Sequence, residues 1–187
     1  SFPKAMFYGV RGYLSKEYLG IEEDVCIGDP GLLIKEIYPC KKKLKYKLGI
    51  IPHESEVDDK RLTNIKSKLK NQCIIISPKN KNPRSVLKLI NSCEYIISSS
   101  LHGLIVSDSY GIPNGRIKIN EIDDSQDFKF YDYYSSLGES LNTFQIRGNE
   151  DINDFIRICR MPPIDRIERI KYHLNQMFLN FKVNIRK

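Results

Sequence analysis

The feature that most constrains the fold of this chain is an alternation between short apolar runs and longer stretches with helical spacing. The runs have the length and composition of buried strands, which occur in parallel sheets. The expected strands are 47–52, 73–77, 94–98 and 116–119, and the expected helices are 57–69, one that opens at Pro83, and 101–110. This alternation predicts an α/β fold with a mostly parallel sheet, helices on both faces and 94–98 as a central strand.

The two ends of the chain follow a different pattern. Near the start, 5–10 and 24–27 are strand-like and 11–19 is helical. Near the other end, apolar residues recur at spacings of three and four between Ile164 and Phe181. That stripe is typical of a long terminal helix that packs along one side.

Composition limits the kind of protein and its partners. A chain of 187 residues with 41% hydrophobic residues can form one core of ordinary size, and its formal charge of +7 fits either a solvated surface or an anionic partner. The lysine-rich run 41–47 leads into an expected strand and lacks the interleaved aromatics of a single-strand groove, so we expect no nucleic-acid partner.

The compartment is predicted from what the sequence lacks. Five scattered cysteines without a CxxC pair favour neither a disulfide framework nor a zinc site. No apolar stretch is long enough to span a bilayer, and no signal peptide opens the chain. We expect a cytoplasmic protein, with work at the inner face of the membrane left open.

Three expected strand exits carry polar residues. They are 26–31, 50–53 and 97–103, and ligands of open parallel sheets bind beyond the carboxyl ends of the strands. If these strands are neighbours, Asp29, His53 and His102 converge on one crevice. The first two exits also have plainer interpretations, which are a turn around Asp29 and a surface His53. Arg11 could likewise be a solvated arginine at a helix start.

The third exit is the most informative. Ser98, Ser99 and Ser100 precede a helix whose first turn contains His102, so hydroxyl and backbone N–H groups could bind a phosphate or carboxylate beside a proton donor. Gly103 permits close approach of a ligand or a strand. The alternative is an ordinary helix cap with a buried, hydrogen-bonded histidine. With three histidines and no ligand spacing, we expect neither metal nor cofactor.

Taken in order, these segments resemble the polysaccharide pyruvyltransferase family, most closely the members that build ketals on bacterial exopolysaccharides. The matching segments are 10–12 (VRG), 28–33 (GDPGLL), 49–53 (GIIPH), 93–105 (CEYIISSSLHGLI), 108–114 (DSYGIPN) and 128–134 (FKFYDYY). Two positions depart from the family pattern, since many relatives have arginine where this chain has Ser100 and Tyr131. Two cations that could bind phosphate are therefore missing.

The resemblance implies a fold similar to GT-B glycosyltransferases, with two Rossmann-like halves around a cleft, of which this chain holds the C-terminal one. Residues 1–40 would be the end of the N-terminal half and the connection, and residues 41–187 the C-terminal Rossmann-like domain with its long terminal helix. Because an active site in that fold lies between the halves, we expect the isolated chain to be inactive.

The resemblance also implies an activity, which is transfer of the enolpyruvyl unit of phosphoenolpyruvate to a sugar as a pyruvate ketal. The acceptor would belong to an exopolysaccharide, capsule or cell-wall glycan and could be lipid-linked. His102 is the expected general acid/base. The expected substrate-binding residues are Arg11 as an anion clamp, Lys129, the three serines 98–100, and Asp29 and His53 toward the acceptor.

Two alternatives stay open at this stage. A GT-B glycosyltransferase would need a carboxylate for the ribose of its nucleotide-sugar donor, which Glu121, Asp123 or Asp124 could supply. A basic binding module or an inactive truncated form would release neither phosphate nor nucleotide.

Overall fold

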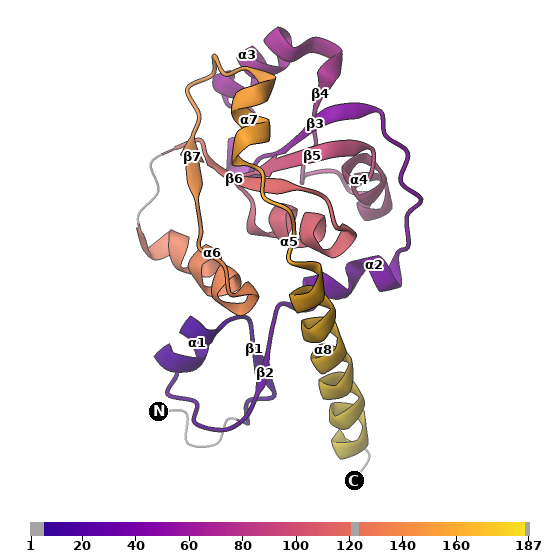
Figure 1. Ribbon diagram of the computed structural model, residues 1–187, viewed down its shortest axis with the longest axis vertical. Helices are drawn as coiled ribbons and strands as arrows, with labels where there is room; N and C mark the ends of the chain where they lie inside the picture. The colour runs from indigo at the N-terminus through magenta and orange to yellow at the C-terminus, as the bar shows by residue number, and fades with distance from the viewer. Residues whose placement is uncertain (1–5, 121–123, 186–187) are drawn as a thin grey trace.

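The fold is built on a five-stranded sheet with strand order β4-β3-β5-β6-β7 (Figure 1). All neighbouring pairs in it are parallel. The strands are β3 (Tyr46–Ile51), β4 (Cys73–Ile75), β5 (Cys93–Ser98), β6 (Asn114–Lys118) and β7 (Thr143–Gln145). The coordinates are a computed structural model that describes residues 6–120 and 124–185.

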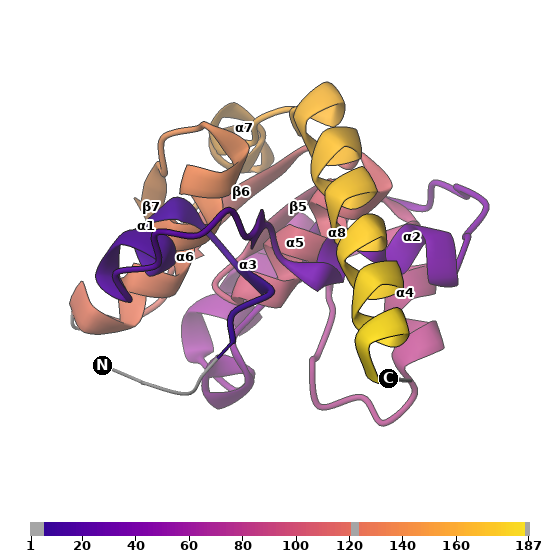
Figure 2. The same cartoon turned by 90° about the horizontal axis from the view of Figure 1, so that it is seen from below.

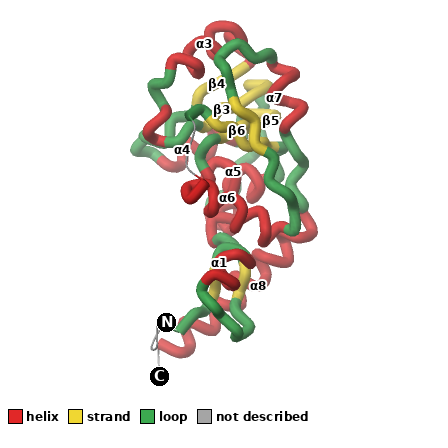
Figure 3. The backbone as a smooth tube through the Cα atoms, turned by 90° about the vertical axis from the view of Figure 1, so that its left-hand side faces the viewer, coloured by secondary structure: helices red, strands yellow, loops and turns green. Residues whose placement is uncertain are grey.

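Helices cover both faces of this sheet (Figure 3). Side chains alternate along a strand, so Leu48 and Ile50 pack with α3 (Lys60–Leu69) and α7 (Ile152–Ile158). Ile51 and its neighbours face the other way, toward α4 (Pro83–Ile90) and α5 (Leu101–Tyr110). The predicted α/β architecture is confirmed, with β5 in the middle of the sheet.

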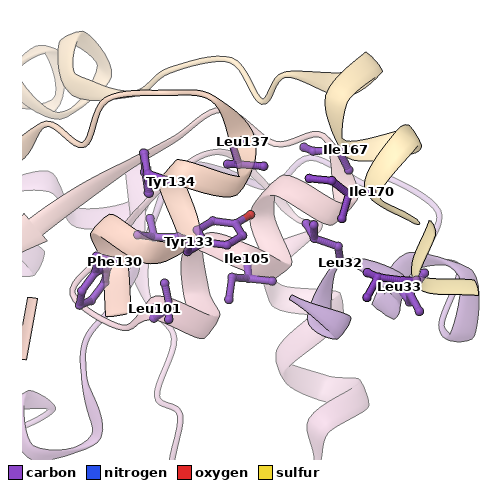
Figure 4. Close-up of a cluster of buried hydrophobic side chains, with 12 residues drawn as sticks. Leu32, Leu33, Leu101, Ile105, Phe130, Tyr133, Tyr134, Leu137, Ile167 and Ile170 are labelled. Carbon is purple, nitrogen blue, oxygen red and sulfur yellow. The ribbon is translucent and has the colours of Figure 1, made fainter. Parts of the chain in front are cut away.

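A second apolar cluster lies on the side of α5 that faces away from the sheet (Figure 4). It joins α5 to α6 (Asp124–Leu137), to α8 (Ile164–Ile185) and to a 3-10 turn at Pro30–Leu33 that is followed by α2 (Ile34–Ile37). The long terminal helix is therefore confirmed, and Ile167, Ile170 and Leu174 of its apolar stripe pack in this cluster, whereas Ile164 is exposed.

The N-terminal segment forms its own small parallel sheet, β1 (Gly9–Val10) with β2 (Cys26–Ile27), joined through α1 (Tyr13–Tyr18) (Figure 1). Two contacts fix α1 on α6: the Ser15 hydroxyl donates to Asp132 Oδ2 at 2.6 Å, and the Tyr13 N–H donates to Ser135 Oγ at 2.9 Å. The start of α1, and Arg11 before it, is thus tied to the rest of the molecule. The division of the chain at residue 40 stays a prediction.

Several boundaries differ from those expected. The strands expected at 5–10 and 24–27 are reduced to β1 and β2, with residue 5 outside the described part, and the helix expected at 57–69 starts at Lys60. A 3-10 turn at Glu54–Glu56 takes the chain from β3 toward that helix. The sequence patterns missed β7, because it is a three-residue edge strand with two of its side chains exposed and so has no buried run.

Candidate functional site

A crevice forms between β3 and β5, where the order in which the chain adds strands to the sheet reverses. The chain leaves β3 toward α3 on one face and leaves β5 toward α5 on the other, although the two strands are hydrogen-bonded neighbours. Loops that diverge from adjacent parallel strands leave a space beyond their carboxyl ends, which is where open α/β sheets bind ligands. His53 follows β3 and His102 follows β5, so this space lies between the two predicted exits.

A cavity of about 280 Å³ occupies this position. Its lining residues are Arg11, Asp29, His53, Ser100, Leu101, His102 and Lys129. All of them except Leu101 were predicted from the sequence as site residues. The structure therefore brings together residues from five separate segments: the loop after β1, the loop after β2, the exit of β3, the exit of β5, and α6.

Both histidines of the cavity are exposed. His102 lies in the first turn of α5, and among the described residues its ring has no hydrogen-bond partner. The alternative of a buried, hydrogen-bonded His102 is therefore wrong. The His53 ring lies over the following turn, where its Nδ1 is 2.9 Å from Ser55 Oγ and accepts from the Ser55 N–H at 3.5 Å. This leaves Nε2 as the nitrogen able to meet a ligand.

The lining of the cavity includes two cations, Arg11 and Lys129, and one carboxylate, Asp29. The Nε of Arg11 is 3.4 Å from Asp29 Oδ2, and its Nη1 donates to the Lys129 carbonyl at 3.4 Å. Asp29 also caps the 3-10 turn by accepting from the Gly31 N–H at 2.8 Å, so the turn interpretation of this residue is confirmed. With the histidines neutral, the lining carries a formal charge of +1, which favours an anion at the N-terminus of α5.

The serines before α5 divide into two kinds. Ser98 Oγ lies 2.8 Å from the carbonyl oxygens of Ile51 and Ser100, and Ser99 Oγ accepts from the His53 N–H at 2.9 Å. Both side chains are buried and join the exits of β3 and β5, so they do not line the cavity. Only Ser100, which makes no side-chain capping bond, keeps the place that the sequence predicted.

Glu56 was missed by the sequence patterns. It is only 4% exposed, and its Oε2 accepts from the Ser99 hydroxyl at 2.5 Å. Through Ser99 this buried carboxylate is linked to the backbone of His53. A glutamate in a polar segment reads as a surface residue, so nothing in the sequence marks it as part of the site's support.

A buried ion cluster beside the site was also missed. Arg116, 2% exposed, pairs through Nη2 with Asp127, which also binds Lys118 Nζ at 2.5 Å. Burial opposes ionisation of Asp127, yet the hydrogen bonds from Lys118 and Arg116 outweigh it and lower the pKa of this carboxyl. The guanidinium lies 3.7 Å from the ring centre of Phe130, so the cluster fixes the turn of α6 that carries Lys129.

Three further expectations concern the carboxylates for a nucleotide-sugar donor, a metal site and a membrane-spanning helix. Glu121 and Asp123, which a nucleotide-sugar donor would require, lie outside the described residues, as does the side chain of Asp124. Within the described residues, no cluster of His, Cys, Asp and Glu is placed to hold a metal ion. In the same part of the chain, no helix combines the length and apolar character needed to cross a membrane.

Comparisons with known proteins show the family of this chain. The family model for polysaccharide pyruvyl transferase matches residues 1–121, which include both histidine exits and end before the segment of Tyr131. An uncharacterized protein of Acanthamoeba polyphaga mimivirus is 30% identical over 159 residues, covering 80% of this chain and 54% of that protein. The chain thus spans about half the length of that curated relative, and no solved structure matches it. The chain belongs to the polysaccharide pyruvyl transferase family.

Proposed function

We propose that this protein transfers the enolpyruvyl unit of phosphoenolpyruvate to a sugar as a pyruvate ketal. The observation that carries the proposal is the cavity between β3 and β5, where two exposed histidines, two cations and a helix N-terminus converge. The proposed acceptor is a sugar of an exopolysaccharide, capsule or cell-wall glycan, which could be lipid-linked, and the proposed location is the cytoplasm.

The donor's two anionic groups fit the groups of the cavity. The first-turn N–H groups of α5 have no intrahelical partner and can donate to a phosphate or carboxylate. Arg11 and Lys129 add positive charge to the lining of the same cavity. A volume of about 280 Å³ is at the small end for ligand pockets, which suits a three-carbon donor with the glycan entering from the open side.

The reaction needs one proton donor and acceptors for two hydroxyl protons. Protonation of the methylene carbon generates an oxocarbenium-like centre at C2, and a sugar hydroxyl adds to that carbon as it loses its proton. The C2–O bond to phosphate then breaks, phosphate leaves with the bonding electron pair, and a second hydroxyl of the sugar closes the ketal as it loses its proton.

His102 is the proposed general acid/base. It is exposed to the cavity and its ring is free of protein partners among the described residues, so it can deliver a proton to the donor. His53 and Asp29 are proposed to orient the acceptor. The Arg11–Asp29 contact gives Asp29 a second task, which is to hold the arginine side chain beside the donor site.

The chain's three histidines allow a binding test with an internal control. Phosphoenolpyruvate should shift the imidazole NMR signals of His53 and His102, which line the cavity. It should leave His173 unchanged, because that side chain is exposed on α8 and lines a different hollow. Replacing Arg11 by Gln should weaken the response about 10- to 100-fold, as expected for a lost charge-assisted hydrogen bond.

The control variant is Lys60→Gln, an equal change of charge at an exposed position on α3. It should leave the titration unchanged. Equal shifts of all three histidines, or a response to a nucleotide sugar in place of phosphoenolpyruvate, would contradict the proposed donor. Turnover is then measured as acceptor-dependent phosphate release by a full-length family member that contains this segment.

A further inference from the structure

A second charged surface lies at the edge of the sheet opposite the cavity. It consists of exposed cations in the segment that leads into β3 and on the neighbouring helix α4 (Figures 1 and 2). We call it the basic flank, and its cations are Lys41, Lys42, Lys43, Lys45, Arg84 and Lys88. Segment and helix meet around a hollow of about 670 Å³.

The positive charge of the basic flank is not neutralised by the protein. Among the described residues, none of its cations takes part in an ion pair. Of the carboxylates nearby in the sequence or the fold, Glu94 is paired with Lys47 at 2.5 Å, and Glu36 accepts from Asn175 at 3.2 Å. Clustered, unpaired cations repel one another, so the flank is suited to an extended anionic partner.

Apolar side chains are interspersed with these cations. Ile37 is 62% exposed and Leu44 is 52% exposed, and the hollow is lined by Leu44, Tyr46 and Leu89 together with lysines. Exposed aliphatic groups among lysines are the pattern of proteins that lie on an anionic lipid surface, where lysines meet head groups and apolar side chains enter the interface.

We infer that the basic flank docks this protein onto an anionic phospholipid surface. A groove for a nucleic acid strand would instead present aromatic rings for stacking. Two aromatic rings near these cations already make cation–π contacts with them. Lys45 Nζ is 5.3 Å from the Tyr46 ring centre, and the Arg84 guanidinium is 5.4 Å from the Tyr38 ring centre.

The position of the flank leaves the cavity free. Strand β3 begins at Tyr46 in the flank and ends at Ile51, immediately before the exit that carries His53. At the usual rise of a strand this separates the two edges by about 17 Å. A molecule docked by the flank therefore has its cavity facing away from the lipid, open to a glycan in solution. The docking inference does not depend on the proposed reaction.

Vesicle co-sedimentation tests the inference directly with the present chain. It should bind vesicles of phosphatidylglycerol and phosphatidylcholine, should not bind vesicles of phosphatidylcholine alone, and should bind more weakly as salt is added. The variant K41Q/K43Q/K45Q should bind roughly 100-fold more weakly, at about fivefold for each lysine near an anionic surface. Leu44→Ser should lower the part of the binding that persists in high salt.

The matched control is K60Q/R147Q/R169Q, which removes the same charge from exposed positions on α3, the loop before α7, and α8. It should change binding by less than about threefold. An equal loss in both triple variants would overturn the inference, because net charge alone would then explain binding. Retention on an anionic polysaccharide without vesicle binding would also overturn it and assign the flank to a glycan.

Discussion

Ser99→Ala tests whether the two strand exits are held together by the buried serine. Its hydroxyl accepts from the His53 N–H at 2.9 Å and donates to Glu56 Oε2 at 2.5 Å. Alanine removes both bonds and leaves a buried carboxylate and a backbone N–H without these partners. Hydrogen bonds to charged groups contribute about 1.5–3 kcal/mol, so we expect a loss of about 2–4 kcal/mol in unfolding free energy.

The assay is urea denaturation, which gives the unfolding free energies of Ser99→Ala and of the control variant Ser100→Ala. The control makes the same chemical change one residue later, at a side chain that makes no capping hydrogen bond, so it should cost less than about 0.5 kcal/mol. Ser99→Ala should also shift the imidazole signal of His53 more than that of His102, because His53 loses a direct partner.

A double-mutant cycle with Glu56→Gln gives the result that would refute this reasoning. The side chains of Ser99 and Glu56 are in contact, so their effects should couple by about 0.5–3 kcal/mol. Additive effects would show that the serine does not act through the carboxylate. Equal destabilisation by Ser99→Ala and Ser100→Ala would likewise remove the proposed link between the exits.

Three further predictions concern the packing, charge and chemistry of the same region. Gly103→Ala should lower the unfolding free energy by about 1–3 kcal/mol in thermal denaturation, because a Cβ there would clash with Ser98 Oγ. At an open helix site the same substitution would raise the unfolding free energy by about 1 kcal/mol. Asp127→Asn should cost about 3–5 kcal/mol at pH 7 by leaving Arg116 unpaired. The pKa of Asp127 is lower in the folded protein than its unfolded value of about 3.9, so its ionised form stabilises the fold. That stabilisation is complete above the unfolded pKa and is lost as pH falls through the folded pKa. The denaturation curves of wild type and variant should therefore approach each other as pH falls below about 4. His102→Ala in a complete, active enzyme should reduce phosphate release about 10²- to 10⁴-fold with an unchanged melting temperature, because the side chain is exposed; near-normal turnover would remove it from the mechanism.

The cavity could be predicted from the sequence because its residues follow recognisable strands. His53 and His102 come directly after apolar runs, and in a parallel sheet such exits gather at one edge. The alternation of apolar and helical segments identified β3 and β5, but it could not show that the two strands are neighbours in the sheet. The structure shows that β3 and β5 are neighbours and that the strand order reverses between them.

The supporting groups could not be predicted, since they depend on contacts between distant parts of the chain. Ser98 and Ser99 were expected to face a ligand, yet the strand's alternation and the approach of the β3 exit hold their hydroxyls inside. Arg116 and Asp127 belong to a strand and a helix that no local pattern connects. Sequence spacing identifies which residues leave a strand, whereas the direction of each side chain is decided by what packs beside it.

The family motifs themselves are of two physical kinds, and this affects what family membership can prove. In the DSYGIPN segment, Asp108 is buried and binds the Tyr133 hydroxyl at 2.7 Å, Arg160 at 2.8 Å and Asn114 at 2.6 Å. This network joins α5, β6, α6 and the chain before α8, and none of its residues lines the cavity. A chain that lost its chemistry could keep such motifs for stability, because breaking a buried charge network costs several kcal/mol. Membership therefore supports the fold more strongly than the reaction, and the reaction depends on exposed groups such as His102, whose loss the fold would tolerate.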